Sequence, residues 1–182
     1  MMKVRVLFAT GNEEVEALTV VDLLRRAGIE CLMVSSEDTD TITSSHNVTI
    51  QMDEKISEIS DDADMIVLPG GIPGVPNFIA NPKVKELVVK QYETGKYVAA
   101  ICAAPTALGA FGILKDKKAV CYPGMEAELC CAEVVMDSVV RDGNVITSRG
   151  LGTAIPFGLA LVECLKNKAC ADEIAKKIVY EY

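Results

Sequence analysis

The sequence is poor in several residue types that would point to particular classes of protein. It contains no tryptophan and one histidine, and 26 acidic side chains outnumber 18 basic ones, giving a net charge of −8. Because an acidic chain repels a phosphate backbone, we expect no nucleic-acid partner. No apolar run approaches the roughly 20 residues that span a bilayer, and the first residues lack the apolar core of a signal peptide. We therefore expect no membrane partner and a cytoplasmic location.

Cysteine is present, but the motifs that would give it a structural role are absent. There is no Cys-x-x-Cys pair, and with one histidine a structural zinc site is not expected. Neither of the two glycine-rich loops has the spacing of a dinucleotide-binding or phosphate-binding motif. The sequence therefore predicts reduced thiols and neither a metal nor an organic cofactor. The seven cysteines form no disulfide framework; they are Cys31, Cys102, Cys121, Cys130, Cys131, Cys164 and Cys170.

What the chain does contain is an alternation of buried strands and helices. Half of its residues are hydrophobic and 24% are charged, which is ordinary for a globular protein, and the length fits one domain over residues 1–182. The chain opens with a strand at Lys3–Ala9, a helix capped by Asn12 that ends near Ala27, and a strand at Cys31–Val34. Further strands are expected at Met65–Leu68, Tyr97–Ile101, Lys118–Cys121, Val134–Met136, Val139–Arg141 and Val145–Thr147. Further helices are expected at Ile56–Ser60, Pro82–Glu93, Pro105–Ala110, Met125–Cys131 and Asp172–Tyr180, with another ending near Leu165.

This order of elements predicts an α/β fold. A mostly parallel sheet would carry helices on both faces, and the short pieces Thr41–Thr43 and Val48–Ile50 would form a small β-hairpin extension at its rim. In such folds, ligands bind at the carboxyl ends of the strands. That rule brings four loops to one edge of the sheet: Gly11–Glu16, Pro69–Gly74, the turn at Cys102 and Ser148–Thr153.

The turn at Cys102 is the most informative of the four. A buried strand ends at Ile101 and a helix begins near Pro105, so that Cys102 lies at an abrupt bend between them. The N-terminus of the helix favours a thiolate, which is the nucleophilic form of cysteine. A cysteine buried in the core would leave the same local pattern, and each glycine-rich loop by itself could be a simple turn. Taken together, the loops predict a pocket in which backbone N–H groups face a thiolate.

Five segments in chain order resemble the motifs of one family. They are Glu13–Glu16, Arg25–Gly28, Val67–Gly71, Ala100–Thr106 and Thr147–Gly150, and together they resemble the ThiJ/PfpI superfamily, in the branch of the parkinsonism-linked protein deglycase. The resemblance covers essentially the whole chain. It implies a flavodoxin-like three-layer α/β/α sandwich, like that of the class I glutamine amidotransferases, and a homodimer.

The resemblance also implies roles for individual residues. Cys102 would be the nucleophile, Glu16 a protonated carboxylic acid beside its sulfur, and the N–H groups of Gly71 and Ala103 the donors to an oxyanion. Burial and a neighbouring thiolate both raise the pKa of a carboxyl group, so a neutral Glu16 is physically reasonable. The alternative is an ordinary first-turn glutamate that interacts with the helix dipole. Further pocket residues implied by the resemblance are Gly70, Tyr122, Ser148, Arg149, Arg26 and His46.

The sequence departs from the family pattern at the positions where histidines are expected. Ala103 follows the cysteine where PfpI-type proteases carry a histidine, and Tyr122 precedes Pro123 where the deglycase branch commonly has one. The only histidine, His46, lies in the expected extension, which in the family is close to the dimer interface. At that place it would approach the other subunit's pocket or be a plain surface residue. Without a Cys–His pair, amide hydrolysis lacks its general base.

Two classes of function remain open. The first is a cysteine-dependent, cofactor-independent glyoxalase or deglycase, a hydro-lyase or hydrolase acting on methylglyoxal, glyoxal or early glycation adducts of proteins or nucleotides. The second is a redox-responsive stress protein or chaperone with an oxidisable Cys102. A PfpI-type intracellular cysteine protease is disfavoured. Arg26 would bind an anion near the dimer face or remain a solvated helix-end arginine.

Overall fold

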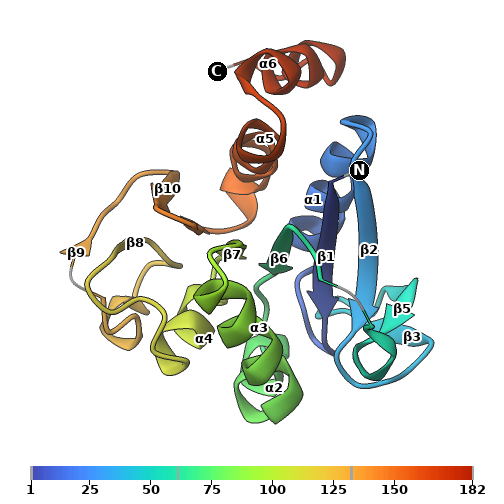
Figure 1. Ribbon diagram of the computed structural model, residues 1–182, viewed down its shortest axis with the longest axis vertical. Helices are drawn as coiled ribbons and strands as arrows, with labels where there is room; N and C mark the ends of the chain where they lie inside the picture. Colours follow the sequence, from blue (N-terminus) through green and yellow to red (C-terminus); the bar gives the residue numbers. More distant parts are fainter. Residues whose placement is uncertain (1, 61, 132, 182) are drawn as a thin grey trace.

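The computed structural model describes residues 2–60, 62–131 and 133–181 (Figure 1). Its central sheet has seven strands in the order β10-β11-β7-β6-β1-β2-β5, and every pairing is parallel except that of β10 with β11. The strands are β1 (Lys3–Phe8), β2 (Glu30–Ser35), β5 (Glu54–Lys55), β6 (Met65–Leu68), β7 (Tyr97–Ile101), β10 (Val139–Asp142) and β11 (Val145–Ser148).

Helices cover both faces of this sheet. They are α1 (Glu14–Arg26), α2 (Gly74–Ala80), α3 (Pro82–Glu93), α4 (Pro105–Ala110), α5 (Ala154–Leu165) and α6 (Lys168–Lys177). In Figure 1, α2, α3 and α4 gather below the sheet, whereas α5 and α6 lie above it. Three 3₁₀ turns, η1 (Ile56–Glu58), η2 (Glu126–Glu128) and η3 (Leu151–Thr153), complete the helical elements of the described residues.

Two hydrophobic clusters show the three layers. Along β1, Val6 and Phe8 belong to one cluster, which also contains core residues of α1, α5 and α6, whereas Leu7 belongs to the other. The second cluster contains Phe78 of α2 and Val88 of α3. Because alternate side chains of a strand point to opposite faces, both faces of β1 are buried, as expected for a parallel sheet between helices. The expected flavodoxin-like α/β/α sandwich is confirmed.

Two small sheets lie outside the central one. Strands β3 (Thr41–Thr43) and β4 (Thr49–Gln51) form the expected antiparallel hairpin. Strands β8 (Lys118–Ala119) and β9 (Glu133–Val134) pair in parallel, so that the strand expected at Val134–Met136 begins one residue earlier and is shorter. The helices expected at Ile56–Ser60 and Met125–Cys131 contract to the turns η1 and η2.

The structure corrects three further expectations. The glycine-rich loop expected at Pro69–Gly74 ends where helix α2 begins, and the sequence analysis places no helix there; proline is tolerated in a first helical turn, and Phe78 is fully buried. Helix α6 begins at Lys168 instead of Asp172, because the Asn167 side chain accepts a hydrogen bond from the N–H of Cys170.

Asn12 is not the cap of α1. That cap is Glu13, whose carboxylate accepts a hydrogen bond from the N–H of Glu16 at 2.7 Å. The side chain of Asn12 instead accepts from the N–H of Ala9 and donates to the carbonyl oxygen of Gly70 at 2.7 Å. Asn12 therefore joins the loop after β1 to the glycine-rich loop after β6.

Candidate active site

The candidate site lies where four adjacent strands end. Going along the sheet, the segments that follow β11, β7, β6 and β1 contribute Gly150, Cys102, Gly70 with Gly71, and Glu16, the last from the first turn of α1. The strand order therefore brings together side chains that are far apart in the sequence.

Cys102 occupies a strained bend between β7 and α4. Its φ is 65°, in the left-handed region that residues other than glycine seldom adopt. Two backbone hydrogen bonds hold the bend: its N–H donates to the carbonyl oxygen of Ser148 at 3.0 Å, and its own carbonyl oxygen accepts from the N–H of Tyr122 at 2.8 Å. The half-buried thiol is therefore fixed in place from both sides.

Glu16 lies in the first turn of α1 and its side chain meets the thiol. The residue is 1% exposed, it forms a hydrogen bond with the side chain of Cys102, and its Oε2 accepts from the N–H of Gly70 at 3.0 Å. A Cβ atom on Gly70 would lie 2.5 Å from that oxygen and 2.6 Å from the Cβ of Cys102. Only glycine at position 70 allows the acid and the thiol to come this close.

The acid and the thiol perturb one another's ionisation. The pKa of Glu16 is raised to about 7, mainly because the carboxyl is buried; hydrogen bonds with Cys102 and Gly70 oppose the rise, and the charge of Glu13 adds to it. Burial, followed by the charge and the hydrogen bond of Glu16, raises the pKa of Cys102 to about 12. The pair therefore holds at most one negative charge at neutral pH.

That single charge can reside on either residue. An ionised Glu16 raises the pKa of the thiol, because a second negative charge beside it is unfavourable. When the proton moves from sulfur to the carboxyl oxygen, the effect reverses, because the neutral carboxyl donates a hydrogen bond that stabilises the thiolate. The N–H groups of Ala103 and Gly71 hydrogen-bond to the sulfur and lower the pKa of Cys102. The arrangement can therefore present a thiolate beside a carboxylic acid and two backbone donors.

Gly71 is held in place by the loop after β1. Its φ of 95° is in the left-handed region, and a Cβ atom there would lie 2.7 Å from the carbonyl oxygen of Gly11. Glycine is therefore required at this position for both reasons, and its N–H is directed at the sulfur by a tightly packed backbone.

A hollow of about 340 Å³ opens beside the thiol. Cys102, Ala103 and Gly71 form one wall of it, and its other lining residues are Ile72, Tyr122, Pro123, Gly124 and Met125. Of the residues expected in the pocket, Tyr122 is thus placed at the hollow.

Gly150 is a site residue that the sequence analysis missed. A Cβ atom there would lie 3.9 Å from the sulfur of Cys102, 3.9 Å from Oε1 of Glu16 and 3.4 Å from the ring of Tyr122. Its φ of 162° is ordinary extended backbone, so glycine is needed for space and not for conformation. The signal in the sequence is the two glycines that follow Arg149, Gly150 and Gly152, which by themselves predict only a loop.

Ser148 and Arg149 contribute differently from what was expected. The hydroxyl of Ser148 bonds the carbonyl oxygen of Ser138 and the hydroxyl of Thr153, both at 2.7 Å, so this residue reaches Cys102 through its backbone alone. Arg149 acts electrostatically on Cys121 and Glu126, which places its charge near the segment that follows β8.

The structure separates Arg26 and His46 from the hollow. Arg26, in the last turn of α1, pairs with Asp22 at 2.6 Å and lines a different depression together with Ile155. His46 lies in the turn between β3 and β4, where its Nδ1 is 3.1 Å from Oε1 of Glu14. An approach of His46 to a second subunit remains a prediction.

One group of side chains has the composition of a cation site. Ligand atoms of Glu13, Glu14 and His46 all lie within 4.8 Å of one another. Carboxylate and imidazole ligands suit several divalent metals. His46 already bridges to Glu14, and no ligand atom of this group belongs to the Cys102–Glu16 pair.

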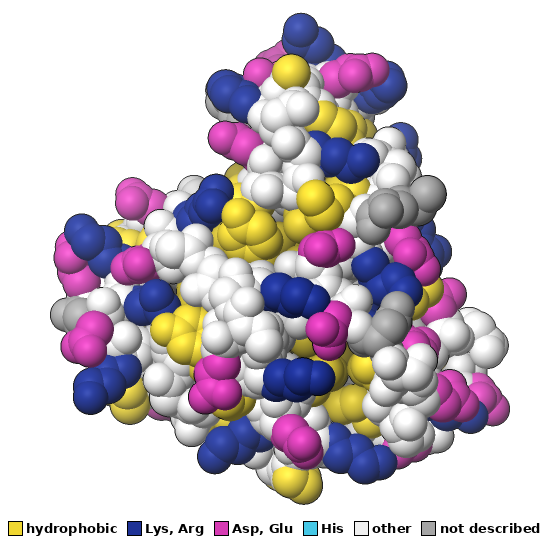
Figure 2. Space-filling view, in the orientation of Figure 1, with side chains coloured by type: hydrophobic (Ala, Val, Ile, Leu, Met, Phe, Trp, Pro, Cys, Tyr) yellow, Lys and Arg dark blue, Asp and Glu magenta, His cyan; other side chains and the backbone are white. Residues whose placement is uncertain are grey.

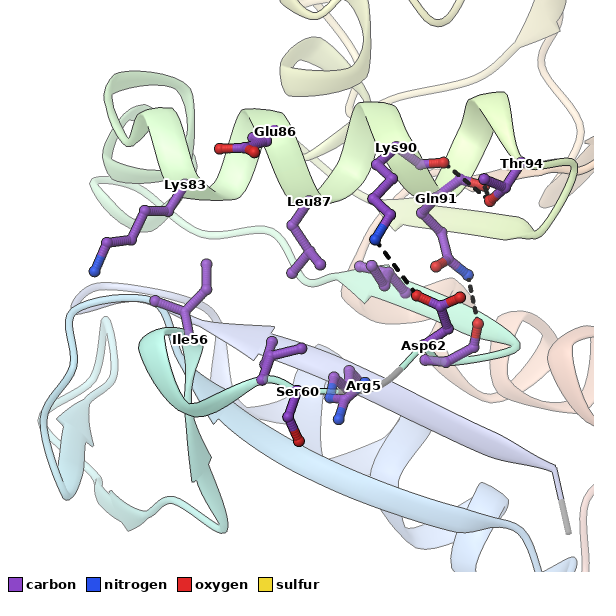
Figure 3. Close-up of a pocket in the computed structure, with 13 residues that line it drawn as sticks. Arg5, Ile56, Ser60, Asp62, Lys83, Glu86, Leu87, Lys90, Gln91 and Thr94 are labelled. Carbon is purple, nitrogen blue, oxygen red and sulfur yellow. Dashed lines mark hydrogen bonds and ion pairs between the residues drawn. The ribbon is translucent and has the colours of Figure 1, made fainter.

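A second hollow lies away from the thiol, between α3 and the segment around η1 (Figure 3). It has a volume of about 290 Å³ and contains charges of both signs that are already paired: Arg5 Nε lies 2.7 Å from Glu54, and Lys90 lies 3.6 Å from Asp62. None of the candidate site residues lines it. Of these two hollows, the one beside Cys102 contains the candidate nucleophile.

The surface and the helices add two observations. Figure 2 shows acidic and basic side chains interspersed over the face in view, without a continuous basic patch. Among residues 2–60, 62–131 and 133–181, no helix combines the length and the apolar character needed to cross a membrane.

Comparison with known proteins identifies the family. The DJ-1/PfpI family model matches residues 2–164. Protein dj-1beta of Drosophila melanogaster is 38% identical over 180 residues, which cover 97% of this chain and 96% of that protein. The glutathione-independent glyoxalase DJR-1.2 of Caenorhabditis elegans is 31% identical over 169 residues, with 91% and 89% covered. The structure of oxidized Toxoplasma gondii DJ-1 superposes with a TM-score of 0.97 at 35% identity, covering 100% of both chains.

Some relatives are longer than this chain. Protein DJ-1 homolog B of Arabidopsis thaliana is 39% identical over 180 residues, which cover 97% of this chain but 41% of that protein. The chain thus spans about two fifths of that relative's length. On the family match and on these similarities, the chain belongs to the DJ-1/PfpI family, in its DJ-1 branch.

Proposed function

We propose that this protein is a cysteine-dependent glyoxalase that converts small α-oxoaldehydes, such as methylglyoxal and glyoxal, into hydroxy acids. The observation that carries the proposal is the buried Glu16 carboxyl hydrogen-bonded to the thiol of Cys102. The glyoxalase activity named for the Caenorhabditis elegans relative supports the same chemistry.

The first step uses the single negative charge of the pair. The Cys102 thiolate attacks the aldehyde carbon, forming a C–S bond, and the electron pair of the C=O bond moves to oxygen. The N–H groups of Gly71 and Ala103, which already bond the sulfur, are within reach of the oxygen that develops next to it. Protonation of that oxygen by Glu16 gives a hemithioacetal and leaves a carboxylate.

The carboxylate of Glu16 then acts as a base. It removes the hydrogen of the former aldehyde carbon as a proton and returns a proton to the neighbouring carbonyl carbon, while the proton of the hemithioacetal hydroxyl passes to the neighbouring carbonyl oxygen. The first carbon is thereby oxidised, the second is reduced, and a thioester to Cys102 results. Water hydrolyses the thioester, releasing the hydroxy acid and the thiol. The net change is the addition of one water molecule. Hemithioacetals and hemiaminals formed by early glycation of proteins or nucleotides would enter the same sequence after they release the thiol or amine and regenerate the free aldehyde.

The test is the formation of lactate from methylglyoxal and of glycolate from glyoxal, measured for the wild type and for Cys102→Ala at equal concentration. We expect product from the wild type only, with both proteins giving the same circular dichroism spectrum. Equal rates for the two folded proteins would contradict the proposal.

A second candidate function is that of a redox-responsive protein, and the donors around the sulfur favour it. The N–H groups of Gly71 and Ala103, together with a protonated Glu16, would stabilise a sulfinate on Cys102. Two equivalents of peroxide would each give one oxygen atom to the sulfur and leave as water. Mild peroxide should then add two oxygen atoms at Cys102 selectively; oxidation spread evenly over the seven cysteines would contradict this function.

A chaperone role and a protease role are tested by different observations. Suppression of aggregation that is equal in the wild type and in Cys102→Ser, without turnover in either, would favour the chaperone. Proteolysis stays disfavoured, because Ala103 follows the cysteine and His46 is paired with Glu14.

The expected homodimer is checked by sedimentation of the full chain.

A further inference from the structure

The hollow beside Cys102 has one chemical character. Its side chains beyond the reacting residues are those of Ile72, Tyr122, Pro123 and Met125, and no charged side chain lines it among the residues that the structure describes. Ile72 and Tyr122 are large hydrophobic residues that are nevertheless 58% and 52% exposed. Apolar surface of this kind, arranged around a concave site, is typical of a ligand-binding wall.

We propose that this hollow binds an apolar substituent of the substrate, so that the preferred substrates are α-oxoaldehydes with an aromatic ring or an extended alkyl chain on the ketone carbon. This inference rests on the proposed glyoxalase function and names its substrate class. Ile72, Tyr122 and Met125 are the residues that determine the preference.

The position of the hollow relative to the reacting sulfur supports the inference. Cys102, Gly71 and Ala103 form one wall of the hollow, so that an aldehyde carbon bonded to the sulfur has its substituent at the entrance to the apolar part. The absence of a side chain on Gly150 leaves room between the sulfur and the ring of Tyr122. A substituent on the ketone carbon, next to the aldehyde carbon that is bonded to sulfur, can therefore contact the opposite wall.

The opposite wall is held in a defined place. The N–H of Tyr122 donates to the carbonyl oxygen of Cys102 at 2.8 Å, and the N–H of Met125 donates to the carbonyl oxygen of Tyr122 at 3.2 Å. The N–H of Gly124 donates to the carboxylate of Glu126 at 2.9 Å. A wall that is formed before the substrate arrives spends little binding energy on ordering itself.

Size separates the possible substrates. The volume of about 340 Å³ lies within the range of about 300–1,000 Å³ that is usual for small-molecule sites. Glyoxal has no substituent and methylglyoxal has one methyl group, so both leave most of the apolar surface in water. A phenyl ring covers it, and since one methylene in an apolar pocket changes kcat/KM by about tenfold or more, we expect at least that gain for phenylglyoxal over methylglyoxal.

The experiment compares kcat/KM for phenylglyoxal, methylglyoxal and glyoxal in the wild type, in Met125→Gln and in Met136→Gln, with Cys102→Ser as the blank. Met136 is the matched control, since it is a methionine that is 61% exposed and does not line the hollow. We expect Met125→Gln to lower kcat/KM for phenylglyoxal at least fivefold more than for methylglyoxal, chiefly through KM, and Met136→Gln to retain the wild-type ratio.

Each remaining outcome has one meaning. Cys102-dependent turnover of all three substrates without a preference for the ring, or an equal loss for all three in Met125→Gln, overturns the inference and leaves the proposed function intact. A Met125→Gln protein that sediments differently from the wild type would assign the wall to a second copy of the chain and also overturn the inference. No Cys102-dependent product from any substrate overturns the proposed function itself.

Binding without turnover provides the second measurement. The Cys102→Ser protein should bind 2-hydroxyacetophenone, which carries the ring but no aldehyde, at least tenfold more tightly than hydroxyacetone, with amide shifts at Gly124 and Met125. Equal affinity for the two ketones overturns the inference whether or not the wild type turns over aldehydes.

Discussion

Two cysteines of the same sheet show how differently one thiol can be placed. Cys31, near the start of β2, and Cys102, directly after β7, both have a pKa raised to about 12, and burial is the main cause in each case. The further causes differ. Around Cys31 they are the opposed charges of Arg25 and Asp53, whereas around Cys102 they include a carboxyl that can take the proton.

The comparison teaches that burial alone does not decide the chemistry of a thiol. At Cys31, forming a thiolate means placing a charge in the hydrophobic core. At Cys102, moving the proton to Glu16 changes the position of a charge that the pair already holds, and the N–H groups of Gly71 and Ala103 favour the thiolate. Substitutions that remove these groups one at a time should therefore reduce the difference in reactivity between Cys102 and Cys31, and we describe them from the largest expected effect to the smallest.

The largest effect is expected from the two cysteines themselves. Cys102→Ser should lower kcat/KM for an α-oxoaldehyde by about a thousandfold or more, because an alcohol is a far weaker nucleophile than a thiolate. Cys31→Ser should retain activity within about twofold and lower the free energy of unfolding by about 1–3 kcal/mol, because a buried hydroxyl replaces a small hydrophobic group. Steady-state kinetics and urea unfolding measure the two. Comparable losses of activity in Cys102→Ser and Cys31→Ser would show that Cys31 also contributes to the reaction.

Removing the proton acceptor comes next. Glu16→Gln should lower kcat/KM by about a hundredfold or more, the usual contribution of a general acid–base group, because the amide cannot accept the thiol proton. Glu14→Gln is the control, since this carboxylate lies two residues away and pairs with His46. It should retain activity within about threefold. Equal losses in the two variants would indicate that the charge of this helix end matters and not proton transfer.

The distance between the acid and the thiol is tested by a methyl group. Gly70→Ala should lower kcat/KM by about tenfold or more, since its Cβ atom would meet Glu16 and Cys102 at 2.5 and 2.6 Å and push them apart. At Gly152 a Cβ atom would meet nothing within 4 Å, and Gly152→Ala should behave like the wild type. The rates of both variants, measured beside their melting temperatures, separate misplacement from unfolding. A fully active Gly70→Ala would mean that the close approach is not needed.

Much of this architecture could be predicted from the sequence. The buried strands around Val67 and Ala99 carry local signals, in the form of continuous apolar runs bounded by turns, and the bend at Cys102 follows from a strand that meets a proline-started helix. Helix α2 could not be predicted in this way, because Gly74 and Pro76 give it the local composition of a turn and only the burial of Phe78 reveals it.

The site required information that local patterns do not contain. Glu16 meets Cys102 because β6 lies between β1 and β7 in the sheet, and the order of strands is a property of the whole chain. The resemblance to a family supplied that pair. It included Gly150 in a motif but gave this residue no place in the site, where it acts by leaving space. It also suggested Arg26, which the fold places on another surface, paired with Asp22.

The smallest effect is expected in the pH dependence of the two thiols. The Cys102–Glu16 pair loses its first proton near the Glu16 pKa of about 7, so alkylation of Cys102 by iodoacetamide should rise about tenfold per pH unit below 7 and level off above it. The alkylation rate of Cys31, which has a pKa of about 12, should still be rising at pH 9.

A substitution at Glu13 refines this test. Because the charge of Glu13 raises the pKa of Glu16, Glu13→Gln should move the rise in the alkylation rate of Cys102 to lower pH and leave that of Cys31 unchanged. Mass spectrometry of the alkylated peptides follows both sites in one sample. A Cys102 profile parallel to that of Cys31 would mean that Glu16 does not take the thiol proton.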